Sequence, residues 1–156
     1  ENIVKLKERV NTSLGIVAKP EKNIYISRGK ANRRFVQNEA AISELLQRYD
    51  FEVVYMEDHA FIEQIRLIAS AKTVVSIHGA ALTLAMFMAE GGNMVEFRKK
   101  DDQSNNMYYL LANAVGLHYY YLLCDYHHVS AHANNFDLEV DPVALETLLR
   151  SLNPSA

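Results

Sequence analysis

Four cations lie within seven residues of this chain, in the segment 28–34 (RGKANRR). The segment separates a predicted strand from a predicted helix, and loops in that position of α/β proteins commonly bind phosphates. Because the planar arginine side chain can contact two phosphate oxygens at once, Arg28 and Arg33 are the preferred phosphate ligands. Lys30 is a further candidate for substrate binding, but Lys30 and Arg34 are less favoured than the other two and are the cations for which exposure to water is the alternative. The alternative is a solvated loop with scattered charge.

A second candidate site lies where a strand gives way to a helix at Gly79. Residues 73–77 (TVVSI) are typical of a buried strand, and residues 80–88 have the composition of a packed helix. A helix that starts directly after a strand leaves backbone N–H groups unpaired, and its dipole adds positive potential there. The small residues Gly79, Ala80 and Ala81 let a diphosphate approach the backbone. We therefore predict a phosphate-bearing ligand at this turn.

Two side chains next to this turn can take part in its chemistry. His78 can donate a hydrogen bond to a phosphate oxygen or act as an acid toward a leaving group. Its alternative is a structural histidine at the end of a buried strand. Thr83, in the first helical turn, can contact phosphate through its hydroxyl, or instead bond to its own backbone.

Carboxylates near strand ends are candidates for binding the hydroxyls of a ribose. Asp58 follows a predicted strand, but it is expected first as the N-cap of the next helix. Glu96 stands between Val95 and Phe97, so strand alternation points it away from its apolar neighbours. Glu96 is the favoured ribose ligand.

Several further polar side chains are not expected to form a site. One cysteine and four histidines lack the spacing typical of a zinc site and are expected to be unliganded: His118, Cys124, His127, His128 and His132. The tyrosines of segment 119–121 are expected to be half-buried packing residues. No G-x-G-x-x-G, P-loop or nucleophile elbow is present, which disfavours an NAD site, a P-loop enzyme and a hydrolase of this fold class.

Composition sets broad limits on the class of protein. The chain has 156 residues, 49% of them apolar, which is enough for one domain with a core. Its formal charge of -3 argues against a nucleic-acid partner, and no apolar run reaches the length of a membrane span. The chain begins with Glu1 and not with methionine, so it is interpreted as a piece of a longer protein. A cytoplasmic location is the expectation, with membrane association or the secretory lumen as alternatives for the full protein.

Strands alternate with helical segments along the chain. Strands are predicted at 24–27, 52–55, 73–77, 93–97 and 118–123, and helices at 3–13, 34–49, 61–71, 80–88, 106–115 and 142–152. This alternation predicts right-handed crossovers and a doubly wound, Rossmann-like, parallel five-stranded sheet with helices on both faces. The two candidate anion sites can share one crevice only if the first and third strands are neighbours, which favours the order 2-1-3-4-5.

The same residues resemble glycosyltransferase family 61, which includes capsular polysaccharide biosynthesis enzymes. The resemblance rests on the order of seven short segments: 25–28 (YISR), 33–34 (RR), 38–39 (NE), 51–54 (FEVV), 63–66 (EQIR), 78–83 (HGAALT) and 95–96 (VE). It implies an inverting, two-domain GT-B enzyme, of which this chain would be the C-terminal half that binds the nucleotide sugar. The N-terminal half would supply the glycan acceptor site and the general base.

The resemblance also implies roles for individual residues. Arg28 and Arg33 would hold the diphosphate together with His78 and the amides of Gly79–Ala81; Glu96 would hold the ribose, and the backbone around Glu57 would face the base. No cofactor and no obligatory metal are implied. The chain departs from the family pattern at Ala81, where glycine is common, and at Leu84, where asparagine is common. The competing hypothesis is a non-catalytic module that binds a nucleotide or phosphorylated metabolite.

Overall fold

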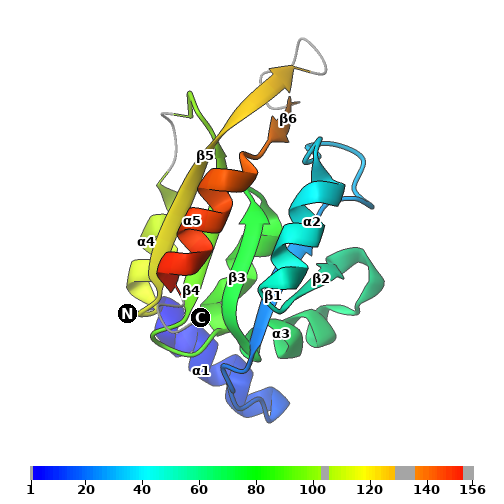
Figure 1. Cartoon of the computed structure of the whole chain (residues 1–156). Helices are drawn as coiled ribbons and strands as arrows, with labels where there is room; N and C mark the ends of the chain where they lie inside the picture. The colour runs from blue at the N-terminus through cyan, green and yellow to red at the C-terminus, as the bar shows by residue number, and fades with distance from the viewer. Residues whose placement is uncertain (1, 103–105, 129–135, 153–156) are drawn as a thin grey trace.

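A computed structural model describes residues 2–102, 106–128 and 136–152. The chain forms a single sheet flanked by helices (Figure 1). The elements in chain order are α1 (Asn2–Leu14), β1 (Lys22–Ser27), α2 (Glu39–Arg48), β2 (Phe51–Tyr55), the 3-10 helix η1 (Met56–Asp58), α3 (Phe61–Ala69), β3 (Ala71–Ile77), the 3-10 helix η2 (Ala80–Phe87), β4 (Asn93–Lys99), α4 (Met107–Ala114), β5 (His118–His128), β6 (Phe136–Glu139) and α5 (Pro142–Leu152).

The sheet has six strands in the order β2-β1-β3-β4-β5-β6. The first five strands pair in parallel and follow the predicted order, an arrangement compatible with a Rossmann-like fold. The prediction of five strands is wrong, because β6 adds an antiparallel edge strand to the far end of β5. β6 is only four residues long, so its own sequence carries little strand signal.

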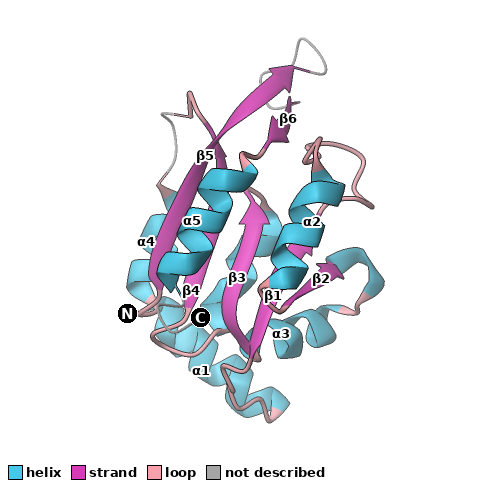
Figure 2. Ribbon diagram, in the orientation of Figure 1, coloured by secondary structure: helices cyan, strands magenta, loops and turns pink. Residues whose placement is uncertain are grey.

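Helices cover both faces of the sheet, as predicted (Figure 2). On one face α2 and α5 enclose a core built on the inward side chains of the strands, including Tyr25 and Phe97. On the other face α1, α3, η2 and α4 enclose a second core around Val74, Leu82 and Met94. The strands are apolar on both sides because both of their faces are covered.

Two predicted helices differ from the observed ones. α2 begins at Glu39 and not at residue 34, because the backbone of Arg34 takes φ +60° and the following residues pair with β6. The amide of Leu138 donates to the carbonyl of Phe35 at 2.9 Å, and the amide of Gln37 donates to the carbonyl of Leu138 at 2.8 Å. The segment 80–87 is a 3-10 helix and not an α-helix.

The predicted N-cap of α5 is confirmed, and the predicted N-cap of α3 is wrong. α5 begins at Pro142, as expected, and the Asp141 carboxylate accepts from the amide of Val143 at 2.8 Å. Asp58 is not the N-cap of α3, because that helix begins at Phe61 with Ala60 before it. The amide of Ala60 instead donates to the Glu63 carboxylate at 2.9 Å.

The topology brings two loops together at the carboxyl edge of the sheet. β1 and β3 are neighbours over most of their length, with Ile26 opposite Ser76. The loop that follows Ser27 and the turn that follows Ile77 therefore lie side by side. Within the described residues, no helix is long and apolar enough to cross a membrane.

Candidate functional site: a basic turn beside an apolar cavity

Two arginines from the loop after β1 converge on the turn after β3. The Arg34 Nη1 donates to the backbone carbonyl of His78 at 3.4 Å. Arg28 donates from Nη2 to the backbone carbonyl of Arg33 at 3.2 Å, and its Nη1 lies 3.3 Å from the point where a Cβ on Gly79 would be. The two guanidinium groups thus flank the His78–Gly79 peptide.

Arg34, and not Arg33, carries the second cation of this site. The Arg33 side chain is exposed, while Arg34 is half-buried, which reverses the preference for Arg33 over Arg34. Arg34 also adopts φ +60°, a strained conformation for a residue with a side chain. Its Nε is buried and has no hydrogen-bond partner among the described residues. Backbone strain and an unsatisfied buried donor both occur more often at functional sites than elsewhere in a fold.

The electrostatics of the loop favour an anion. Burial lowers the pKa of the Arg34 guanidinium, and the positive charges of Arg28 and Arg33 lower it further. Burial also lowers the pKa of Arg28, partly offset by the carboxylate of Glu57. Arg28 and Arg34 nonetheless stay protonated at neutral pH. Mutually repelling cations at one loop are stabilised by any anion that binds between them.

The turn at Gly79 presents backbone donors to the same place. The first i+3 bond of η2 runs from the amide of Leu82 to the carbonyl of Gly79 at 3.0 Å, so the amides of residues 79–81 precede it. Gly79 is in extended backbone, with φ 176°, and its carbonyl also accepts from the Tyr108 hydroxyl at 2.5 Å. Tyr108 therefore anchors the turn from α4.

His78 is held on two sides. Its Nδ1 contacts the Glu96 carboxylate, and its ring meets the Tyr108 ring edge-on, with centroids 5.0 Å apart. The His78 side chain is 22% exposed, so part of the ring remains open to a ligand.

Glu96 is placed differently from the ribose ligand that was expected. It is 1% exposed, and its second oxygen accepts from the hydroxyl of Tyr119. Tyr119 in turn interacts with Arg98, whose Nη2 donates to the Asp102 carboxylate at 3.2 Å. With both oxygens occupied and no exposed surface, Glu96 is not accessible to a ribose in this structure.

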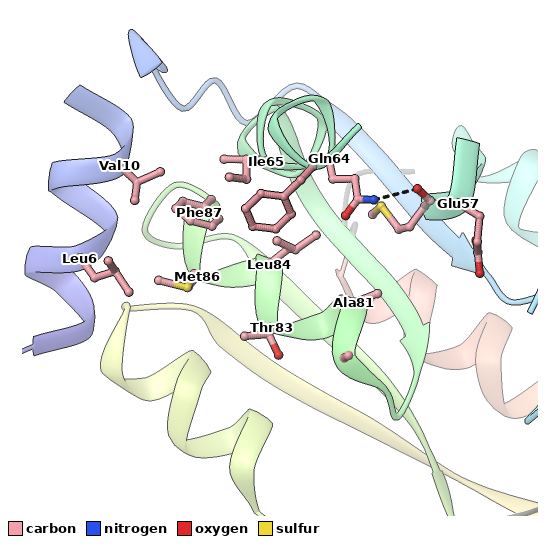
Figure 3. A pocket seen from close by; sticks show the side chains of 13 residues that line it. Leu6, Val10, Glu57, Gln64, Ile65, Ala81, Thr83, Leu84, Met86 and Phe87 are labelled. Carbon is pink, nitrogen blue, oxygen red and sulfur yellow. Dashed lines mark hydrogen bonds between the residues drawn. The ribbon is translucent and has the colours of Figure 1, made fainter. Parts of the chain in front are cut away.

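An apolar cavity of about 670 Å³ opens next to the turn, between α1, α3 and η2 (Figure 3). Leu6 and Val10 reach it from α1, and Phe87 and Leu84 from η2. Four of the predicted site residues lie on its wall: Glu57, Ala80, Ala81 and Thr83. The side chain of Thr83 is exposed and that of Ala81 half-buried. Leu84, one of the two departures from the family pattern, also faces this cavity.

The remaining predicted polar residues lie apart from the turn. Lys30 pairs with the Asp58 carboxylate, with Nζ to Oδ1 at 2.7 Å, and its Nζ lies over the Tyr55 ring at 4.8 Å. Both members of this ion pair are about half exposed, so it contributes little stability. Lys30 is thus engaged away from the His78–Gly79 peptide.

The histidines and the cysteine whose side chains the structure describes do not gather around a common point. His127 lies 3.4 Å from the Glu139 carboxylate, His118 is exposed, and Cys124 is buried. His132 and the side chain of His128 lie outside the described residues. Across the residues that are described, no three of His, Cys, Asp and Glu cluster as metal ligands would.

Sequence reasoning missed three residues that build the site: Arg34, Tyr108 and Tyr119. The adjacent arginines at 33–34 look alike in sequence, and only the left-handed turn decides which one points inward. Tyr119 was interpreted as a packing residue of its strand. The pairing of β4 with β5 places Tyr119 beside Glu96, and this register has no local sequence signal.

The fold and the basic turn define an α/β domain with a polar site at the carboxyl edge of a mainly parallel sheet. Residues 2–95 match the model of the family Glycosyltransferase 61. The chain belongs to glycosyltransferase family 61, in agreement with the resemblance seen in the motifs.

Curated relatives bear the name protein O-linked-mannose beta-1,4-N-acetylglucosaminyltransferase 2. The mouse protein is 32% identical over 93 residues, which cover 58% of this chain and 16% of the relative. The human protein is 30% identical over 93 residues with the same coverage. The Xenopus tropicalis protein is 36% identical over 67 residues, covering 42% of this chain and 12% of the relative. The chain therefore matches less than a fifth of the length of these relatives.

Proposed function

We propose that this chain is the nucleotide-sugar-binding part of an inverting glycosyltransferase of the two-domain GT-B type. The observation that carries the proposal is the convergence of Arg28 and Arg34 on the His78–Gly79 turn. In this proposal the guanidinium groups and the amides of residues 79–81 bind the diphosphate of the donor. Family membership supports the choice of a sugar donor over other phosphate-bearing ligands.

The apolar cavity accommodates the nucleoside. It adjoins the turn through Ala80 and Ala81, so a diphosphate bound there directs its nucleoside toward the cavity. The wall carries few polar groups, among them Glu57 and Gln64. The Gln64 Nε2 donates to the backbone carbonyl of Met56 at 2.8 Å, which fixes the side-chain amide at the wall of the cavity (Figure 3). An apolar pocket with a few fixed polar groups is typical of small-ligand sites.

The reaction would be a direct displacement at the anomeric carbon of the sugar. The oxygen of an acceptor hydroxyl forms a bond to that carbon while its bond to the diphosphate oxygen breaks. The hydroxyl proton passes to a base on an N-terminal domain outside this chain, and the negative charge develops on the departing diphosphate. In this proposal Arg28, Arg34 and His78 stabilise that charge, and no obligatory metal takes part.

The names of the relatives suggest which sugar and acceptor to test first. They describe N-acetylglucosaminyl transfer to O-linked mannose, which makes UDP-N-acetylglucosamine the first donor and an O-mannosyl glycan the first acceptor. A capsular polysaccharide is the second acceptor class.

Calorimetric titration with UDP, GDP, CDP and UDP-N-acetylglucosamine, each with and without EDTA, tests the proposal. We expect saturable binding of one diphosphate that EDTA does not change. If no nucleotide binds either to this chain or to the full-length protein, the donor-binding proposal is wrong. Binding of a nucleotide without sugar transfer by the full-length protein would favour a non-catalytic module.

A further inference from the structure

A buried carboxylate lies directly behind the histidine of the candidate site. Glu96 is 1% exposed, stands in the middle of β4, and contacts the Nδ1 atom of His78. We propose that Glu96 is a positioning residue, which fixes the His78 ring so that Nε2 is the nitrogen presented to a bound phosphate. The proposal rests on the proposed function for the identity of the ligand, but its structural part can be tested without any ligand.

The numbers of donors and acceptors on His78, Glu96 and Tyr119 favour one arrangement of the protons. In the proposal the Glu96 carboxylate is the acceptor of this contact, and the Nδ1 of His78 carries the proton. The other carboxylate oxygen accepts from the Tyr119 hydroxyl. In a neutral His78 ring the lone pair then lies on Nε2, and in a protonated ring Nε2 is a donor that can meet a phosphate oxygen.

Neighbouring groups keep Glu96 itself in place. Burial and the bond to Glu96 raise the pKa of the Tyr119 phenol, so that this hydroxyl remains a donor at neutral pH. Arg98 approaches the same hydroxyl and is anchored by Asp102. A carboxylate fixed by His78 in the turn after β3 and by Tyr119 on β5 has little freedom to rotate.

The opposite restraint on the ring comes from α4. The Tyr108 ring packs edge-on against His78, and the Tyr108 hydroxyl binds the carbonyl of Gly79. His78 is therefore held relative to the backbone amides that follow it. Orienting the ring before the ligand arrives avoids an entropy cost on binding. A residue that does not contact the ligand can strengthen ligand binding in this way.

The first test reads the position of the proton directly. Long-range ¹H–¹⁵N spectra of the chain with labelled histidine distinguish the two ring nitrogens, and the His78→Gln variant assigns the signal. We expect Nδ1 of His78 to carry a proton in the wild type, and the signal to shift toward the Nε2–H tautomer in Glu96→Ala. A neutral wild-type ring with its proton on Nε2 overturns the proposal, even if Glu96→Ala fails to fold.

A control variant separates positioning from general loss of stability. Met94 is fully buried on the same strand and on the same face as Glu96. Met94→Ala is expected to lower stability while leaving the proton on Nδ1. If Met94→Ala changes the His78 signal as much as Glu96→Ala does, the effect is not specific to the carboxylate and the proposal is wrong.

The second test asks whether Glu96 acts through His78. We expect Glu96→Ala to weaken UDP binding about tenfold in the wild-type background and less than about twofold in the His78→Gln background. Equal effects in both backgrounds would overturn the proposal. If another diphosphate is the one that binds, it replaces UDP in this test. If no nucleotide binds to this chain or to the full-length protein, the proposed function fails, and the proton position alone then decides the role of Glu96.

Discussion

The guanidinium group of Arg34 donates to the backbone carbonyl of His78, and this single bond joins the loop after β1 to the turn after β3. The two residues are 44 positions apart in the chain and meet because β1 and β3 are neighbours. The bond occupies Nη1 and leaves the buried Nε of Arg34 without a partner among the described residues. Arg34 thus supports the turn through one nitrogen of its guanidinium group, while a second nitrogen is buried without a partner in the described residues.

Arg34→Ala is expected to weaken UDP binding by about tenfold or more, because a hydrogen bond to a charged partner is lost. Arg33→Ala is the matched control, since it removes the same charge from the adjacent exposed position. It should change affinity by less than about threefold, through long-range charge alone. Calorimetry on both variants measures the difference. Equal losses would show that net charge, and not the position of Arg34, governs binding.

Gly79→Ala should weaken UDP binding while leaving the fold intact. Gly79 has φ 176°, so its backbone accepts a side chain, but the new Cβ would lie 3.3 Å from Nη1 of Arg28. The methyl group would displace the guanidinium and obstruct approach to the amides.

Gly15→Ala is the control variant, for which we expect lower stability and unchanged UDP binding. Gly15 has φ +61° with no atoms near its added Cβ, so alanine there costs about 1 kcal/mol of unfolding free energy through strain. UDP affinity should not change. Urea unfolding and calorimetry on the two variants together test the distinction, and unaltered binding in Gly79→Ala would argue against a ligand at this turn.

Leu138→Ala should lower the unfolding free energy by about 2–5 kcal/mol, because it leaves a cavity at a fully buried position. Leu138 lies on β6 and also pairs through its backbone with the segment before α2. Val143→Ala, at an exposed position of α5, should cost about 0.5 kcal/mol or less. Denaturant unfolding of both variants measures these two changes in unfolding free energy. A neutral Leu138→Ala would mean that the sixth strand does not belong to the folded core.

The stability of the chain should fall above pH 9, in part because of Cys124. Burial raises the pKa of its thiol from 9.0 to about 12 in the folded state. The folded protein therefore holds this proton over a pH range where the unfolded chain releases it, and the stabilisation is complete below pH 9 and lost as the pH rises toward 12. The difference in unfolding free energy between wild type and Cys124→Ala should shrink over that range. A difference independent of pH would contradict the buried, protonated thiol.

Much of the fold follows from local patterns in the sequence. The apolar runs, the turn residues and the caps place five strands and most helices, since these signals depend on residues close together in the chain. The order of those strands was predicted from chemistry, because the two candidate phosphate-binding segments could share a crevice only if the first and third strands were neighbours. The edge strand β6 was not predicted. Its backbone pairs with β5 and with the segment before α2, and the pairing with that distant segment forms only when the chain has folded.

The sequence by itself determined the family, the alternating architecture and the two loops that carry the candidate site. Only the tertiary structure decided the geometry within that site. The choice between Arg33 and Arg34 depends on one left-handed backbone turn, and the contact of Glu96 with His78 depends on the register of β3 and β4. Side chains from separate strands meet only when the sheet assembles, so no local pattern could assign Glu96 to histidine instead of ribose.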